Sequence, residues 1–247
     1  MLIDTHCHIH EANYPNASGA LDRAHQAGVS KLVCVGTNNE TSREAAEFAS
    51  RHDNVYFSVG THPHDSKDGY VEIERITIET PKKLVAIGEI GLDYFYTHSP
   101  KETQIKTFEA QLQLAFDYKL PVIFHVREAF DDFWPIFRNF PGITGVLHSF
   151  TDTVENMEKG VSEGLCIGVN GISTFARDKQ VVWDAIPLDK MVLETDAPFL
   201  TPVPYRGKVN EPAFVRNVAE YHAKARKVEL EHLARVTSAN ASTLFSI

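Results

Sequence analysis

The sequence has little of what disulfide-rich, membrane-spanning or exported proteins need. It holds three cysteines, Cys7, Cys34 and Cys166, and each lies in a strand-like run, which suits buried, reduced thiols in a cytoplasmic protein. The longest apolar runs are only a few residues, far below the roughly 20 needed to cross a bilayer. No basic, apolar leader precedes Asp4, so we expect neither a secretory signal nor a membrane partner.

A surplus of positive charge is missing too. The formal net charge is −9, which argues against a large nucleic-acid grip, because such a grip neutralises many phosphates with Lys and Arg. A small pocket that reads one phosphate is not excluded. Linkers, low-complexity tracts and internal repeats are also absent, so we expect one domain over residues 1–247. That length matches a (β/α) barrel of about 250 residues.

The sequence does contain an alternation of short β-branched runs with amphipathic stretches, which is typical of repeated βα units. Eight runs are expected to form strands: 2–8, 31–35, 55–60, 84–89, 122–126, 146–148, 165–169 and 191–196. Eight strands with intervening helices predict an α/β fold of the (β/α)8 TIM-barrel type.

Helical segments are marked by capping patterns and apolar spacing. Capping boxes are expected at Thr41–Glu44 and Ser99–Glu102, and a helix is expected over Tyr70–Thr80. The clearest helix follows Pro100, where apolar residues recur at three- and four-residue spacing and predict one buried stripe. These residues are Ile105, Phe108, Leu112 and Phe116.

The first strand carries the first sign of a site. Because side chains alternate along a strand, His6 and His8 point the same way. They could offer two nitrogens to one divalent cation, or they could cap the strand and touch solvent. Four further strands end in or near a residue of ligand type: Glu89, His125, His148 and Asp196. In a parallel barrel these strand ends meet on one face.

Four imidazoles and two carboxylates are too many for a single tetrahedral ion. They suit two ions about 3.5–4 Å apart, with one bridging carboxylate and room for a hydroxide. Mixed nitrogen and oxygen ligands favour zinc or manganese, and magnesium is the further candidate. We therefore expect two divalent metal ions per subunit.

Seven motifs resemble, in order, those of the TatD family of metal-dependent hydrolases, described as deoxyribonucleases on an amidohydrolase-like barrel. They are Asp4-Thr-His-Cys-His8, Gly60-Thr-His-Pro-His64, Gly88-Glu-Ile-Gly-Leu-Asp-Tyr94, Pro121-Val-Ile-Phe-His125 with Arg127, His148-Ser-Phe150, Leu193-Glu-Thr-Asp-Ala-Pro198 and Arg206-Gly-Lys-Val-Asn-Glu-Pro212. The resemblance covers nearly the whole chain. It implies that His6, His8 and Asp196 hold one metal, that His125 and His148 hold the other, and that Glu89 bridges them.

Residues near the strand ends supply further candidates. The resemblance places His62 facing the site, where we expect it to bind phosphate or the leaving group instead of a third metal. Arg127 and Arg206 are expected to bind substrate, whereas Lys208 is expected to be a solvated charge. Asp4 is expected to accept from an imidazole N–H. His64 and Asp93 suit either loop-fixing or functional roles.

The function that the resemblance implies is phosphodiester hydrolysis of DNA, which we expect to proceed from single-stranded ends. A hydroxide activated by two metals would attack, with Asp196 as proton acceptor and Glu89 as bridging ligand. The same site could instead cleave an ester, for example in D-aminoacyl-tRNA, or the barrel could bind metal without catalysis. The PHP phosphoesterases also open with His-x-His, but the contexts of Glu89 and Asp196 fit the TatD family better.

Overall fold

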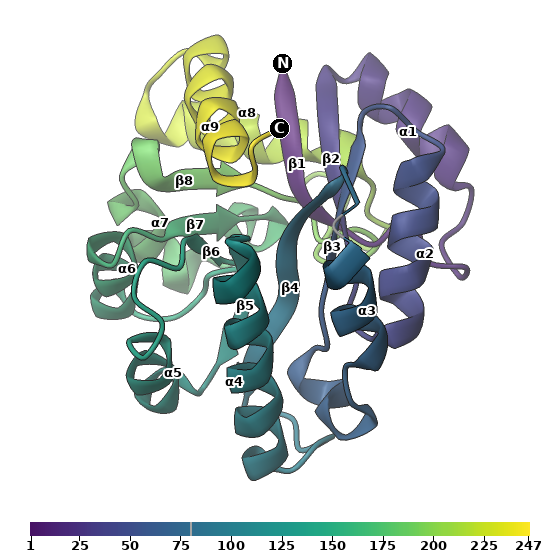
Figure 1. Cartoon of the computed structure of the whole chain (residues 1–247). Helices are drawn as coiled ribbons and strands as arrows, with labels where there is room; N and C mark the ends of the chain where they lie inside the picture. Colours follow the sequence, from purple (N-terminus) through teal and green to yellow (C-terminus); the bar gives the residue numbers. More distant parts are fainter. Residues whose placement is uncertain (80) are drawn as a thin grey trace. The chain divides into compact units, whose positions relative to one another are not determined.

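The computed structural model describes residues 1–79 and 81–247. Its eight strands follow one another in chain order and alternate with helices (Figure 1). This is the order of a (β/α)8 TIM-type barrel, so the predicted fold class is confirmed. The chain forms two compact units: unit 1 is residues 1–34 with 149–247, and unit 2 is residues 35–148. A single domain over residues 1–247 stays a prediction.

Unit 1 holds the first and last strands. Its elements are β1 (Leu2–Cys7), α1 (Ala17–Gln26), β2 (Val29–Val35, all but the last residue), α6 (Val154–Ser162), β7 (Cys166–Val169), α7 (Gln180–Ala185), β8 (Met191–Leu193), α8 (Val215–Arg226) and α9 (Leu230–Phe245). β1 pairs in parallel with β2, and β7 with β8. α9 packs against β1 and β8 (Figure 1). Because β1 is buried along its whole length, the side chains that it carries have fixed surroundings.

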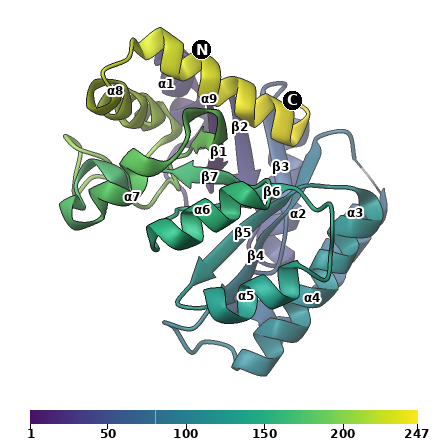
Figure 2. The same cartoon turned by 90° about the vertical axis from the view of Figure 1, so that its left-hand side faces the viewer.

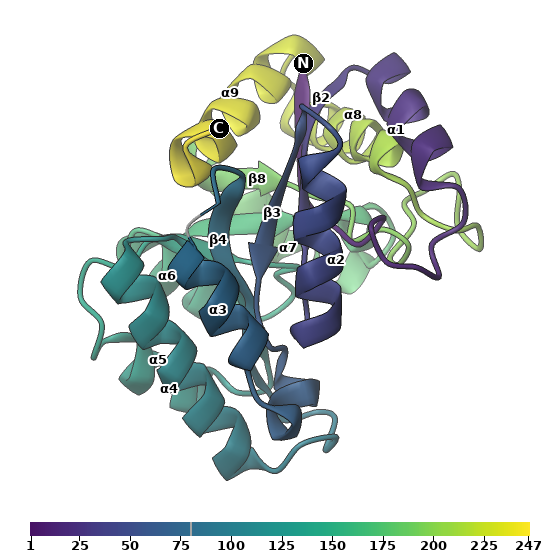
Figure 3. The ribbon, with the colours of Figure 1, turned by 45° about the vertical axis from the view of Figure 1, so that its right-hand side comes forward.

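Unit 2 holds the four middle strands. Its elements are α2 (Asn39–Ser50), β3 (Val55–Val59), α3 (Val71–Glu79), β4 (Leu84–Asp93), α4 (Lys101–Tyr118), β5 (Val122–Arg127), α5 (Phe130–Phe137) and β6 (Gly145–Leu147). β4 pairs in parallel with β3 and β5, and β5 with β6. α4 and α5 cover β4 and β5 (Figure 2), whereas α2 and α3 lie against β3 (Figure 3). The Phe133 ring lies 5.8 Å from that of Phe108 and 5.2 Å from that of Phe124, which ties both helices to β5.

Both predicted capping boxes are wrong. α2 begins earlier than expected, and Asn38 is its cap: its side chain accepts from the N–H of Thr41, whose own side chain accepts from the Asn38 N–H. α4 has no side-chain cap. The Ser99 hydroxyl instead donates to the carbonyl oxygen of His64 at 2.6 Å. A serine next to a helix start can bond a neighbouring loop as readily as its own helix.

Two other predictions also need correction. β4 runs on to Asp93 where we expected it to end at Glu89. Gly91 permits this, because its φ is 149° and a Cβ there would collide with the carbonyl oxygen of His125 on β5. On α4, Phe116 is 44% exposed, so it does not belong to the buried stripe. The expected helix Tyr70–Thr80 corresponds to α3, and its last residue lies outside the described residues.

The helices can be compared with membrane-spanning segments by length and hydropathy. Within residues 1–79 and 81–247, none combines the length and the hydropathy that spanning a bilayer requires.

Candidate metal centre

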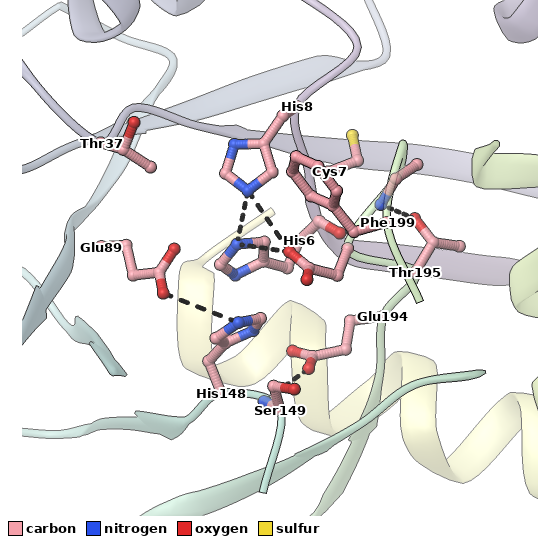
Figure 4. Close-up of polar contacts among 12 residues, drawn as sticks. His6, Cys7, His8, Thr37, Glu89, His148, Ser149, Glu194, Thr195 and Phe199 are labelled. Carbon is pink, nitrogen blue, oxygen red and sulfur yellow. Dashed lines mark hydrogen bonds and ion pairs between the residues drawn. The ribbon is translucent and has the colours of Figure 1, made fainter. Parts of the chain in front are cut away.

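In unit 1 the structure brings together His6, His8 and Asp196, here called the unit 1 triad. The Nε2 atoms of His6 and His8 lie 3.1 Å apart, and Oδ1 of Asp196 lies 3.5 Å and 3.4 Å from them. Figure 4 shows the two imidazoles turned toward each other. Asp196 has a φ of 58°, and its N–H donates to the carbonyl oxygen of His6. Two nitrogens and one carboxylate oxygen this close together are a donor set for a divalent cation.

Asp4 lies beneath this triad, but its partner is not the one expected. Its carboxylate accepts from the Thr195 hydroxyl at 2.6 Å and the Thr195 N–H at 2.9 Å. It also accepts from the His6 N–H at 3.3 Å, so the expected bond to an imidazole is wrong. Asp4 therefore holds the backbone at His6 and at Thr195, the residue before Asp196. Burial raises the pKa of its carboxyl to about 8, although these hydrogen bonds act in the opposite direction.

In unit 2 the structure brings together His62, Glu89, His125 and His148, here called the unit 2 cluster. Oε1 of Glu89 is its centre, because it lies 2.8 Å from Nδ1 of His125, 3.6 Å from Nε2 of His62 and 3.7 Å from Nε2 of His148. Figure 4 shows the contact between Glu89 and His148. β4 and β5 carry Glu89 and His125, while His62 and His148 follow β3 and β6.

The tautomer of His62 distinguishes it from the other candidate ligands of the unit 2 cluster. The backbone N–H of His64 donates to Nδ1 of His62 at 3.1 Å. A neutral His62 therefore carries its proton on Nε2, which leaves that atom no lone pair for a cation. Burial lowers the pKa of His62 well below its usual value, and the neighbouring His125 adds to this effect. His62 is thus a neutral hydrogen-bond donor, which is the chemistry expected of a substrate-binding group.

Asp93 orients His125 from the other side. Its Oδ2 lies 2.9 Å from Nε2 of His125 and 3.0 Å from Nε2 of His64. With Asp93 accepting from Nε2, Nδ1 of His125 is left to face Glu89, an arrangement in which a carboxylate orients a metal-binding imidazole. Burial lowers the pKa of His125, but the bonds to Asp93 and Glu89 outweigh it and raise the pKa. Burial raises the pKa of Asp93, yet its hydrogen bonds bring the pKa below the usual range.

Two glutamines of α4 hold this cluster in place, and the sequence analysis missed both. The Gln111 amide accepts from the Thr61 N–H at 2.7 Å and donates to the Thr61 carbonyl at 3.1 Å. Gln104 makes the same pair of bonds with Asp93, at 2.9 and 3.0 Å. Both side chains are buried around Phe108, at spacings of four and three residues. Glutamine inside an apolar helical stripe was the signal, because a buried amide needs partners.

The predicted basic residues lie on the surface. Arg127 ends β5 and Arg206 lies in the loop between β8 and α8, and both are exposed. One Arg206 nitrogen donates to the Thr201 carbonyl at 2.8 Å, and the guanidinium lies 3.8 Å from the Phe175 ring centre. Lys208 is exposed, as expected of a solvated charge. Phosphate contacts of the two arginines stay predictions.

Each unit therefore offers a set of donor atoms that fits a divalent cation. In the unit 1 triad one ligand atom per residue lies within 4.8 Å of the others, and in unit 2 the Glu89 carboxylate lies 2.8 Å from a nitrogen of His125 and 3.7 Å from a nitrogen of His148. Imidazole nitrogens mixed with carboxylate oxygens suit zinc, manganese and similar ions better than ions that take oxygen ligands alone. In unit 2 the tautomer of His62 leaves His148, 3.7 Å from Glu89, as the better third ligand.

Comparison with known proteins agrees with this chemistry. The sequence model described as "TatD related DNase" matches residues 3–246. The uncharacterized metal-dependent hydrolase YabD of Bacillus subtilis is 36% identical over 256 residues, with 100% of both chains covered. The 3'-5' ssDNA/RNA exonuclease TatD of Escherichia coli K12 is 37% identical, over 91% of this chain and 90% of its own. The crystal structure of YjjV, a TatD homologue from E. coli, superposes with a TM-score of 0.92 at 31% identity, covering 100% and 98% of the two chains.

Proposed function

The chain belongs to the TatD family of metal-dependent hydrolases, and we propose that it hydrolyses phosphodiester bonds at the ends of single-stranded nucleic acid. The observation that carries this proposal is the presence of a histidine–carboxylate cluster in each unit. A relative 37% identical to the chain is named a 3'-5' ssDNA/RNA exonuclease, which supports nucleic acid as the substrate.

We assign two divalent cations to the ligands that the motifs predict. One is held by His6, His8 and Asp196; the other is held by His125 and His148, with Glu89 shared between the ions as the family resemblance implies. Bound cations would lower the pKa of a coordinated water towards about 7 and offset charge on a phosphoryl oxygen. Zinc, manganese and magnesium are the candidate ions.

The protein's own groups divide the remaining work. Asp196 accepts the proton of the attacking water, because its carboxylate lies 3.4–3.5 Å from the two imidazoles with which it would share a cation and its coordinated water. His62 donates a hydrogen bond from its Nε2–H to a phosphate oxygen or to the leaving-group oxygen, which follows from its tautomer. Arg127 and Arg206 bind the neighbouring phosphates, for which guanidinium groups have the matching geometry.

An end-acting enzyme also fits the charge of the chain. A protein that grips long duplexes neutralises many phosphates, but this chain carries −9. Two arginines and two bound cations would be enough to neutralise the phosphates of the last few nucleotides of a strand. Single strands also fit, because an end that enters a metal site must be free of its complement.

The test is activity on oligonucleotides whose products are resolved by length. Metal-loaded protein is incubated with a single-stranded 12-mer labelled at its 5′ end, with a closed circular single strand of the same composition, and with D-aminoacyl-tRNA. We expect a ladder of stepwise shortened 12-mers and an intact circle. Cleavage of the circle would contradict the end-acting reaction. Hydrolysis of the aminoacyl ester without any loss of nucleotides would contradict the phosphodiesterase and favour a deacylase.

A further inference from the structure

Within unit 2, the loop after β4 presents aromatic rings to solvent. Phe95 is 49% exposed and Tyr96 is 42% exposed. The loop is held by Asp93, whose Oδ1 accepts from the N–H groups of Phe95 and Tyr96, each at 3.0 Å. Large apolar side chains exposed together on a pinned loop mark a surface for binding.

The rings form a connected group beside the unit 2 cluster. The Phe95 and Tyr96 ring centres are 4.7 Å apart, and the Tyr96 ring stacks on that of His98 at 5.6 Å and 25°. Tyr96 also lies 5.4 Å from His64, which shares Asp93 with the ligand His125. A molecule resting on these rings would therefore lie next to the groups assigned to metal.

Arg127 adds a positive charge to this group. Its guanidinium carbon lies 3.8 Å from the Phe95 ring centre and 5.0 Å from that of Tyr96. Stacking on an aromatic ring holds a guanidinium in place. Its N–H groups, which lie in the plane of the guanidinium, stay available for a ligand. Arg127 is exposed at the end of β5, so its positive charge is accessible to a ligand from solvent.

We propose that Phe95, Tyr96 and Arg127 form a binding platform for one unpaired nucleobase and its adjacent phosphate. The base stacks on the exposed rings, and the guanidinium binds the phosphate oxygens. Paired bases have both faces covered by their neighbours, so the platform selects single strands over duplexes. This inference rests on the proposed function, and it names the residues that would recognise its substrate.

The test separates stacking from phosphate contact by changing the protein and the ligand together. Binding of a fluorescent dT10 oligonucleotide is measured in EDTA, where metal-dependent hydrolysis stops, and is compared with an otherwise identical abasic strand. Tyr96→Ala should weaken dT10 binding about 5- to 150-fold and leave the abasic strand unchanged, as expected when one stacked base is lost. Phe95→Ala should weaken dT10 binding by at least as much and should also weaken the abasic strand, because it removes the ring on which the Arg127 guanidinium stacks. Arg127→Gln should weaken both strands alike. Phe116→Ala, which removes another exposed phenylalanine, should change neither.

Each outcome decides one question. The platform is overturned if wild-type protein binds dT10 no more tightly than the abasic strand. It is also overturned if the Phe95→Ala and Tyr96→Ala variants keep the wild-type Tm and bind dT10 within twofold of wild type. Turnover is then measured separately with metal restored. Binding that depends on the platform, without any nucleotide release by wild type, would support the platform and remove the proposed function. If wild type releases nucleotides but the platform variants bind dT10 as wild type does, the proposed function is supported and the platform is overturned.

Discussion

Replacing Gln111 with methionine tests whether α4 positions the unit 2 cluster. Methionine keeps the length of the side chain but loses the amide that pairs with both backbone groups of Thr61. Thr61 is 1% exposed, so its N–H and carbonyl would lose partners that water cannot replace. An unsatisfied buried polar group costs about 1–3 kcal/mol, so the loss of partners for both groups in Gln111→Met should lower the free energy of unfolding by about 2–6 kcal/mol.

The matched control is Gln113→Met on the same helix. Gln113 is exposed and its amide donates to Asp117 at 2.7 Å, so its loss should cost under about 0.5 kcal/mol. Urea unfolding followed by circular dichroism measures both variants. Because Thr61 precedes His62, kcat of Gln111→Met should also fall while that of Gln113→Met holds. Equal stability of the two variants would refute the positioning role.

Three further results are expected. Burial, with help from Arg226, lowers the pKa of His222 from 6.5 to about 4, so its stabilising contribution is complete above pH 6.5 and is lost as the pH falls towards 4. Wild type should lose about 3 kcal/mol more than His222→Gln over this range in urea unfolding at each pH, and parallel curves would contradict this. Asp196→Asn should lower kcat at saturating metal by about 10²- to 10⁴-fold, and near-normal turnover would place the proton acceptor elsewhere. Arg206→Ala should weaken binding of single strands without changing metal content, and the log–log salt slope of wild type should match only about one to three contacts at −0.7 each. A steeper slope would show that the protein contacts more phosphates than this account allows.

The sequence was sufficient for the fold class because strand positions depend on local patterns. Hydrophobic, β-branched runs alternate eight times with amphipathic segments, and this alternation predicts a parallel (β/α)8 barrel whose strands follow in chain order. His6 and His8 could be placed together because strand alternation is a geometric rule. Glu89, His125 and His148 could be expected to converge because parallel strands end at one edge, and in unit 2 they do.

What could not be predicted depends on contacts between distant segments. The Ser99 hydroxyl bonds the carbonyl of His64, 35 positions earlier, so its local capping pattern was misleading. The shortest hydrogen bonds of Asp4 come from Thr195, 191 positions later in the chain, which strand parity could not reveal. The tautomer of His62 depends on one backbone N–H. Each of these bonds depends on the tertiary structure, which secondary-structure propensity and hydrophobic periodicity do not predict.

Metal content tests the central claim most directly. Wild type, Glu89→Gln and the exposed control Glu102→Gln are loaded with zinc or manganese, desalted and analysed for metal per chain. Because the Glu89 carboxylate lies within 3.7 Å of three imidazoles, its replacement should leave the protein folded but remove most of the bound metal. Wild type and Glu102→Gln should each retain two ions. Two full equivalents of metal in a well-folded Glu89→Gln variant would contradict the assignment of Glu89 as the shared ligand.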